Sequence, residues 1–309
     1  MNRETIRKSL TGIIVPIATP FREDYSLNTE AVSKTVPFLL SRGIHAVMAC
    51  GSTGESASMS LEERKQMIQE TVSVVDKKAL VIAGVSDSYY RNVIELGQFS
   101  ERVGADCLIL VAPYYYYPSE DEVVNFFSLL NREIDIPFLF YNNPATAKIN
   151  ASTQLIERLG ELKNFAGLKD TNSQPVRFME FLKRFGSRFA VIPAGEPAAI
   201  FNLISGAKGF MTVAANFLPE LLVSLFEATQ KRDLDRAFTL FEKLATYRQL
   251  FEARVAAGYP AYVVFAKAGM NLRGLPAGPV RPPLIYPTPV ELERLREIMR
   301  TVLEISVTA

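Results

Sequence analysis

The sequence predicts a (β/α)8 barrel, or TIM barrel, followed by a C-terminal helical extension. Eight short apolar runs recur along the chain with starts about 20 to 34 residues apart, the length of one strand–helix unit. These runs are apolar without alternation, and burial on both faces is what a parallel sheet requires. The expected strands are Gly12–Thr19, His45–Cys50, Ala79–Val85, Cys107–Pro113, Pro137–Tyr141, Phe165–Lys169, Phe189–Pro193 and Gly209–Ala214.

The segments between these strands carry helix signals. Two capping boxes, Ser60–Glu63 and Ser119–Glu122, mark helix starts, because a serine and a glutamate three residues later cap each other's backbone. Gly43, Gly104 and Gly160 stand where helices should end before the next strand. Eight such units in series favour a closed barrel, and a doubly wound sheet is the structural alternative.

The pattern changes after Phe217, where helical stretches follow one another without a further strand. These stretches are Pro219–Gln230, Asp233–Val255, Pro260–Leu272 and Pro289–Ser306, with a connector rich in Pro and Gly at Arg273–Pro289. We therefore expect the barrel in residues 1–217, with its final helix extending to about residue 230. Residues 231–309 are expected to form a helical extension packed on the barrel.

Composition excludes several classes of protein. The 309-residue chain has a net charge of +1 and no basic run, so neither nucleic acid nor an anionic membrane is an expected partner. Its apolar runs are strand-sized, and the first ten residues, MNRETIRKSL, lack a signal core, so we expect a cytoplasmic protein.

Scarce histidine and cysteine limit the possible chemistry. A single histidine, His45, cannot supply a multi-histidine metal site, and we expect it to be structural. We also expect no catalytic triad based on histidine. Cys50 and Cys107 lie in apolar runs and are expected to be reduced core thiols. No metal is expected, and acid–base chemistry is left to Lys, Tyr, carboxylates, hydroxyls or water.

Reactive groups follow several expected strands, and a barrel carries its active site at these strand ends. After the second strand, Ser52 and Thr53 stand between two glycines, in a turn that can present N–H and hydroxyl groups to a carboxylate or phosphate. A plain tight turn is the alternative. After the fourth strand come the tyrosines of residues 114–117, which would also suit a packed loop or a subunit contact.

The fifth and sixth strands end in a phenol and an amine. Tyr141 could relay protons or simply cap the barrel rim. Lys169 directly follows an apolar strand, where burial would favour its neutral, nucleophilic form, unless it reaches out to solvent. Together an amine, a phenol and a carboxylate-binding turn are the parts needed to make an enamine from a 2-keto acid.

Six motifs resemble one known family. They are AVMACGSTGESASMSLEE, YNNP, GLKDT, AGEP, GAKGFMTVAAN and KAGMNLRGLPAGPVRPPL. They are similar to the dihydrodipicolinate synthase / N-acetylneuraminate lyase superfamily of class I pyruvate aldolases, and the resemblance runs from about Gly12 to Pro283.

The resemblance implies residue roles. Lys169 would be the Schiff-base lysine, and Tyr141 would shuttle protons and contact the substrate carboxylate. Ser52 and Thr53 would bind that carboxylate, with Ser52 also in the proton relay. 

The resemblance further implies that Tyr115 is lent by a neighbouring subunit and that Met211 flanks the bound keto acid. It implies a homotetramer built as a dimer of dimers, with no metal or organic cofactor.

Departures from the family pattern bear on the substrate. Synthases that condense pyruvate with aspartate semialdehyde have an arginine where this chain has Thr146, and threonine cannot hold a carboxylate bidentately. Sialic acid lyases have acidic residues soon after Gly195, where this chain has Pro197 and Ala198 beyond Glu196. Both activities are therefore disfavoured, and the sequence leaves open whether Glu196 points inward.

The leading hypothesis is an aldolase or lyase that cleaves, or condenses, a 2-keto-3-deoxy sugar acid to pyruvate and an aldehyde. Gly195 and the hydroxyls of Thr146 and Thr171, with Asn172 nearby, would line the substrate pocket. The alternatives are a 2-keto-3-deoxy acid dehydratase or aromatic hydratase–aldolase, then dihydrodipicolinate synthase proper, and then a non-catalytic keto-acid-binding paralogue.

Overall fold

Eight parallel strands form a closed barrel in the computed structural model, which describes residues 1–172, 174–250, 252–256, 261–305 and 307. The strands are β1 (Gly12–Pro16), β2 (Ala46–Ala49), β3 (Leu80–Gly84), β4 (Cys107–Val111), β5 (Phe138–Asn142), β6 (Phe165–Asp170), β7 (Ala190–Pro193) and β8 (Gly209–Met211). They pair in chain order, and β8 returns to pair with β1. A parallel bridge between Ala194 and Met211 joins β7 to β8, so the predicted TIM barrel is confirmed.

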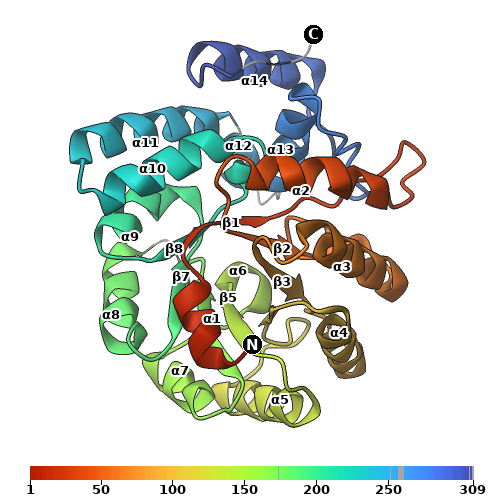
Figure 1. The fold of residues 1–309 in the computed structure, drawn as a ribbon, viewed down its shortest axis with the longest axis vertical. Coiled ribbons are helices and arrows are strands. Elements are labelled where there is room, and N and C mark those ends of the chain that lie inside the picture. Colours follow the sequence, from red (N-terminus) through yellow and green to blue (C-terminus); the bar gives the residue numbers. More distant parts are fainter. Residues whose placement is uncertain (173, 251, 257–260, 306, 308–309) are drawn as a thin grey trace.

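Helices surround the strands (Figure 1). They are α1 (Arg3–Ser9), α2 (Val32–Leu40), α3 (Leu61–Val75), α4 (Tyr90–Val103), α5 (Glu120–Glu133), α6 (Pro144–Ala147), α7 (Thr153–Gly160), α8 (Pro175–Phe185), α9 (Ala199–Ile204), α10 (Pro219–Gln230), α11 (Leu234–Gln249), α12 (Glu252–Ala256), α13 (Ala261–Leu272) and α14 (Pro289–Thr301). Both predicted capping boxes are present, at Ser60–Glu63 and Ser119–Glu122. Gly104 takes the left-handed conformation that ends α4, with φ 95°.

Two predicted helices differ from the structure. The stretch predicted as one helix over Asp233–Val255 contains α11 and α12, because the chain tightens at Leu250, whose N–H bonds to Tyr247 three residues back. Helix α14 ends at Thr301 rather than Ser306, and a left-handed Glu304 follows it. Two of the predicted helix ends, Pro260 and Ser306, lie outside the described residues.

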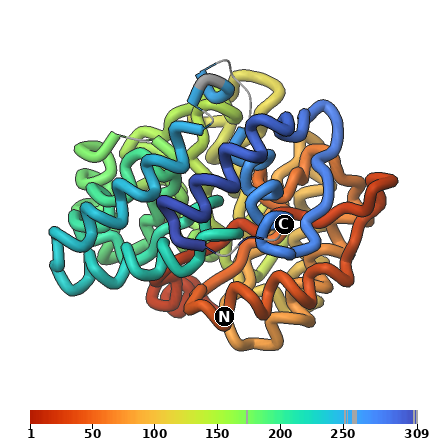
Figure 2. Tube along the Cα trace, turned by 90° about the horizontal axis from the view of Figure 1, so that it is seen from above, coloured from red at the N-terminus to blue at the C-terminus, as the bar shows by residue number. Residues whose placement is uncertain are grey.

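The helices after β8 cover one side of the barrel. Helix α13 is buried along nearly its whole length and packs against η4 (Ala214–Asn216), the turn that follows β8. The tube view shows the loop after β4 reaching the top of the molecule, away from the N-terminus (Figure 2). The division of the chain into a barrel and an extension stays a prediction.

His45 and the two cysteines take structural places. The His45 Nδ1 accepts a hydrogen bond of 3.1 Å from the Ile13 N–H and its ring packs directly over Gly12. Cys50 and Cys107 are free and buried. Within the part of the chain that the structure describes, no helix is both long and apolar enough to cross a bilayer.

Candidate active site

Lys169 lies on β6 with only 6% of its surface exposed. Its strand neighbour on β5 is Tyr141, and the Lys169 Nζ lies 3.8 Å from the centre of the Tyr141 ring. Burial lowers the pKa of the Lys169 amine to about 7, an effect that the negative charge of Glu196 partly opposes. The amine is therefore neutral in a substantial fraction of molecules near neutral pH, which is the form that attacks a carbonyl group.

Tyr141 is buried beside the amine, with two hydrogen-bonding neighbours. Its phenol is hydrogen-bonded to the Ser52 hydroxyl and accepts a bond of 3.2 Å from the Asn143 Nδ2. Burial nevertheless raises the pKa of Tyr141 to about 12, against the lowering by these two hydrogen bonds. The phenol thus carries its proton at neutral pH, and the structure brings the candidate residues Lys169, Tyr141 and Ser52 together.

The turn after β2 brings Ser52 to this group. Cys50 and Glu55, at its two ends, both have φ 54° in the left-handed region, which makes the chain turn sharply. Ser52 is exposed at the apex, whereas Thr53 is buried. The Thr19 Oγ1 donates to the Gly54 carbonyl at 2.6 Å and fixes the turn against the end of β1.

Glu196, whose direction the sequence left open, turns toward the end of β8. Its Oε1 accepts hydrogen bonds from the Thr212 hydroxyl at 2.6 Å and from the Ala214 N–H at 3.3 Å. Its charge acts on Lys169, so a carboxylate lies on the same side of the barrel as the amine. The apolar Pro197 and Ala198 follow it in η3 (Glu196–Ala198).

The remaining predicted pocket residues are only partly brought together. Met211 is buried on β8, and Gly195 directly follows the bridge at Ala194, with φ 96°. The Thr171 hydroxyl donates its proton to the Asn142 carbonyl, at the end of β5, at a distance of 2.9 Å. Thr146 lies in α6 and is exposed, with no contact to Lys169 or Tyr141 among the described contacts.

No contact described in the structure joins Tyr115 to Lys169 or Tyr141. Its side chain is 74% exposed in the loop after β4, and its ring packs edge-on against that of Tyr116 at 5.2 Å. Tyr117 is also exposed, and the Lys148 Nζ lies 4.7 Å from the centre of its ring. A tyrosine lent to a neighbouring subunit would project in this way, and its role stays a prediction.

Two polar residues of α13 near the site, one partly and one fully buried, were not predicted from the sequence. Burial raises the pKa of Tyr262, on α13, and the nearby Tyr141 raises it further. Lys267, on the same helix, is completely buried and pairs with Glu55. A lysine inside the apolar run VVFAKAGM was the available signal for this second buried amine.

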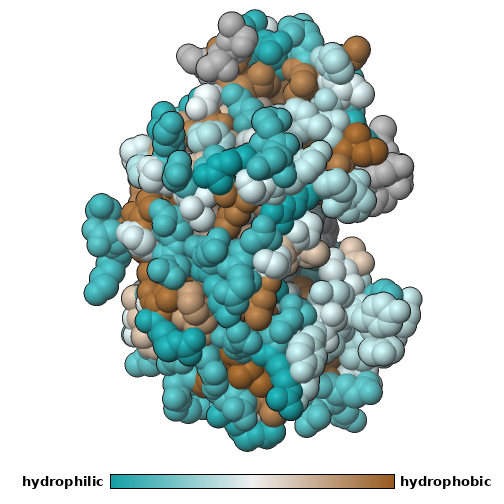
Figure 3. Space-filling view, turned by 90° about the vertical axis from the view of Figure 1, so that its right-hand side faces the viewer, coloured by the Kyte–Doolittle hydropathy of each residue, from teal (hydrophilic) through white to brown (hydrophobic). Residues whose placement is uncertain are grey.

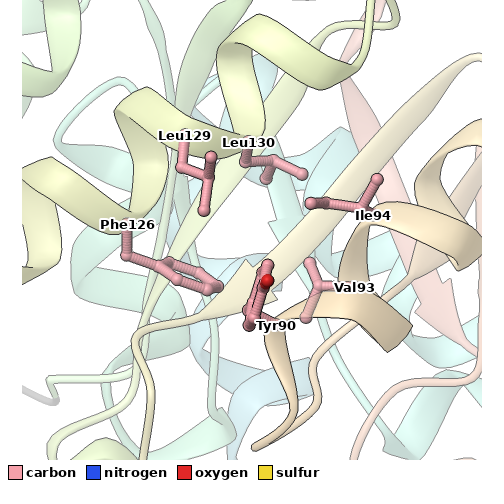
Figure 4. Close-up of a pocket in the computed structure, with 6 residues that line it drawn as sticks. All are labelled: Tyr90, Val93, Ile94, Phe126, Leu129 and Leu130. Carbon is pink, nitrogen blue, oxygen red and sulfur yellow. The ribbon is translucent and has the colours of Figure 1, made fainter.

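The surface carries two visible hollows. Figure 3 shows a mostly hydrophilic surface with a hollow at its right-hand edge. A separate, shallow apolar hollow lies between α4 and α5 (Figure 4), lined by Tyr90, Val93, Ile94, Phe126, Leu129 and Leu130. This second hollow belongs to the outer helices and contains none of the predicted site residues. Among the residues that the structure describes, no three His, Cys, Asp or Glu side chains are placed to hold a metal ion.

Eight parallel strands form the barrel, and a buried lysine and a phenol lie near the carboxyl ends of two of them, so the fold class is that of a TIM-barrel enzyme. The chain belongs to the dihydrodipicolinate synthetase family, because the model of that family matches residues 9–305. Members of this family are class I aldolases and lyases, and the chain is an enzyme of that kind.

Similar proteins cover nearly the whole chain. A 4-hydroxy-tetrahydrodipicolinate synthase of Methanosphaerula palustris is 32% identical over 94% of this chain and 98% of its own. An uncharacterized DapA-like lyase of Thermococcus onnurineus is 32% identical over 95% of this chain and 100% of its own. The crystal structure of the chloride-inhibited dihydrodipicolinate synthase of Acinetobacter baumannii, complexed with pyruvate, is 27% identical, with a TM-score of 0.87 over 96% of this chain and 100% of its own.

Proposed function

We propose that Lys169 forms a Schiff base with pyruvate or a related 2-keto acid, and that the enzyme cleaves or forms a 2-keto-3-deoxy sugar acid. Cleavage would release pyruvate and an aldehyde. The observation that carries this proposal is the buried Lys169 amine, 3.8 Å from the Tyr141 ring, with a pKa lowered to about 7. The pyruvate bound by the Acinetobacter baumannii relative supports a keto acid as the substrate.

The proposed reaction begins with imine formation. The neutral Lys169 amine adds to the keto carbon, and the resulting carbinolamine loses its hydroxyl as water, taking a proton from Tyr141. This step leaves a protonated imine on Lys169 and a phenolate on Tyr141. The Ser52 hydroxyl, hydrogen-bonded to that phenol, would stabilise the phenolate and pass protons on.

Carbon–carbon cleavage would follow from the same two groups. The Tyr141 phenolate takes the proton of the substrate's C4 hydroxyl, the C3–C4 bond breaks, and its electron pair moves into the iminium to give an enamine. The aldehyde leaves, C3 is protonated, and water hydrolyses the imine to release pyruvate and the free lysine. Throughout, Ser52 and Thr53 would hold the carboxylate next to the reacting carbon.

Two other reaction outcomes use the same imine. Dehydration of a 2-keto-3-deoxy acid, or hydratase–aldolase cleavage of an aromatic keto acid, is favoured by the apolar Pro197 and Ala198 beside the site. Dihydrodipicolinate synthesis is favoured by the names of close relatives, but Thr146 lacks the fork of donors that a second carboxylate would need. Product analysis with sugar-acid, aromatic and aspartate semialdehyde substrates separates the three.

Borohydride trapping tests the proposal directly. The protein is incubated with pyruvate, reduced, and examined by intact mass and peptide mapping. We expect a reduced pyruvyl adduct on Lys169 in the wild type and in Lys163→Ala, which removes an exposed lysine, but none in Lys169→Ala. A folded wild type that gives no adduct with any 2-keto acid overturns the proposal. An adduct without exchange of the pyruvate methyl protons would identify a non-catalytic binding protein.

The proposal includes a cytoplasmic homotetramer in which Tyr115 completes a neighbour's site. The exposed tyrosines of residues 115–117 support such a contact. Light scattering of the wild type, and turnover by a mixture of Tyr115→Phe and Lys169→Ala chains, test it. Complementation in the mixture is expected if each site takes its tyrosine from another subunit.

A further inference from the structure

Lys267 and Glu55 form a buried ion pair between α13 and the turn after β2. The Lys267 Nζ lies 2.7 Å from the Glu55 Oε1, and the two side chains are 0% and 2% exposed. The same Nζ donates to the Pro279 carbonyl at 2.6 Å and lies 4.1 Å from the centre of the Phe21 ring. Burying two charges costs desolvation that their attraction often only offsets, so stability alone is a poor reason for this pair.

Glu55 occupies a backbone position that needs support. Its φ of 54° lies in the left-handed region, which costs energy for any residue with a Cβ and persists only where the surroundings hold it. Its side chain is held at both oxygens, because the Oε2 accepts from the Arg281 N–H at 2.8 Å. Its own N–H donates to the Ser52 carbonyl at 3.1 Å, so the position of Glu55 is transmitted to Ser52.

Arg281 strengthens the same connection. Its guanidinium pairs with Glu63 at the start of α3 and donates to the Ser58 carbonyl at 2.7 Å. The connector between α13 and α14 therefore bonds to Glu55 and also to residues just beyond the turn that follows β2. Gly278 in this connector lies so close to the Phe21 carbonyl that a Cβ would stand 1.8 Å from the oxygen, so only glycine lets the connector pack against the segment that follows β1.

We infer that Lys267 and Glu55 are positioning residues that hold the turn of residues 50–55 in the shape that binds the substrate carboxylate. Neither touches the reacting atoms. Lys267 fixes Glu55, Glu55 fixes the turn, and the turn presents Ser52 and Thr53. This role rests on the proposed function, in which those two residues bind the carboxylate of a 2-keto acid.

A neutral double variant separates positioning from folding. Lys267→Met together with Glu55→Gln removes both charges and keeps side chains of similar length, so no unpaired charge is left buried. Arg254→Met is the matched control, because it breaks another ion pair of the C-terminal helices, Arg254–Glu291 at 2.6 Å, without touching the turn. Exchange of the pyruvate methyl protons for deuterium, followed by NMR, gives KM and the rate at saturation.

We expect the double variant to raise KM for pyruvate about tenfold and to lower the saturated rate by a smaller factor, about threefold. The amine and the phenol are untouched, but a displaced Ser52 serves the proton relay less well. Borohydride should still trap the adduct on Lys169 at saturating pyruvate. The Arg254→Met control should keep the wild-type KM.

A folded double variant with the wild-type KM for pyruvate overturns the inference. The inference is also overturned if the Arg254→Met control shows the same rise in KM and the same fall in the saturated rate as the double variant. If the double variant does not fold, Glu55→Gln alone is measured by the same criterion, because Lys267 can shed its proton when its partner is neutral. A wild type that neither exchanges protons nor forms an adduct overturns the proposed function, and this inference with it.

Discussion

Lys169 and Tyr141 are paired across β5 and β6, and the lysine Nζ lies 3.8 Å from the centre of the tyrosine ring. A ring face attracts a cation and would by itself favour the charged amine. Burial removes water from the amine and lowers the pKa of Lys169 to about 7, against the opposing charge of Glu196. The pairing leaves a neutral nucleophile beside a protonated phenol.

The charge of Glu196 should set the pH at which the site becomes active. Because Glu196 raises the pKa of Lys169, Glu196→Gln should lower it further and shift the acid limb of adduct formation to lower pH. Adduct formation in the wild type should rise as pH passes about 7. The rate at which borohydride traps the adduct, measured between about pH 5 and 9, gives the acid limb of the wild type and that of Glu196→Gln. Glu180→Gln, at an exposed residue, is the control. Superimposed limbs for wild type and Glu196→Gln would contradict this role.

Tyr141→Phe should separate imine formation from proton transfer. The ring that packs against Lys169 remains, but the phenol that donates and accepts protons is lost. We expect turnover, measured as pyruvate proton exchange, to fall by about 10²- to 10⁴-fold, while a slow adduct on Lys169 still forms. Asn143→Ala, which removes only a hydrogen bond to that phenol, should cost much less. A Tyr141→Phe enzyme with near wild-type exchange would exclude the phenol as the proton carrier.

The sequence predicted the barrel, which the structure confirms, and it pointed to Lys169 and Tyr141 as candidate site residues, because both predictions rest on local patterns. Strand-sized apolar runs set the fold, and Lys169 and Tyr141 follow such runs directly. The Lys267–Glu55 pair joins residues 212 positions apart (267 − 55), and no local pattern reports such a contact. The direction of Glu196 was equally hidden, since it depends on Thr212 at the end of another strand.

Burial of Lys169 should make stability depend on pH. Its folded pKa of about 7 lies below the 10.5 expected when the chain unfolds, so between these values the unfolded chain binds more protons. The free energy of unfolding should therefore rise with pH across this window, by up to about 1.4 kcal/mol per pH unit from this group. Lys169→Met should flatten the rise, and Lys267, with a pKa lowered to about 8, should supply what remains. Chemical denaturation at about pH 7, 8 and 9 measures the slope, and equal slopes for the two proteins would contradict the assignment.

Asn216 should prove essential to the closure of the barrel between β8 and β1. Its Oδ1 accepts from the Ala18 N–H at 3.0 Å, and its Nδ2 donates to the Pro16 carbonyl at 2.9 Å, so one buried amide ties the turn after β8 to the end of β1. Asn216→Leu leaves both backbone groups buried without a partner and should lower the free energy of unfolding by about 2–4 kcal/mol. The same substitution at the exposed Asn125 of α5 should change it by less than about 0.5 kcal/mol. Equal stabilities for the two variants in urea denaturation would mean that β1 and β8 hold together without this amide.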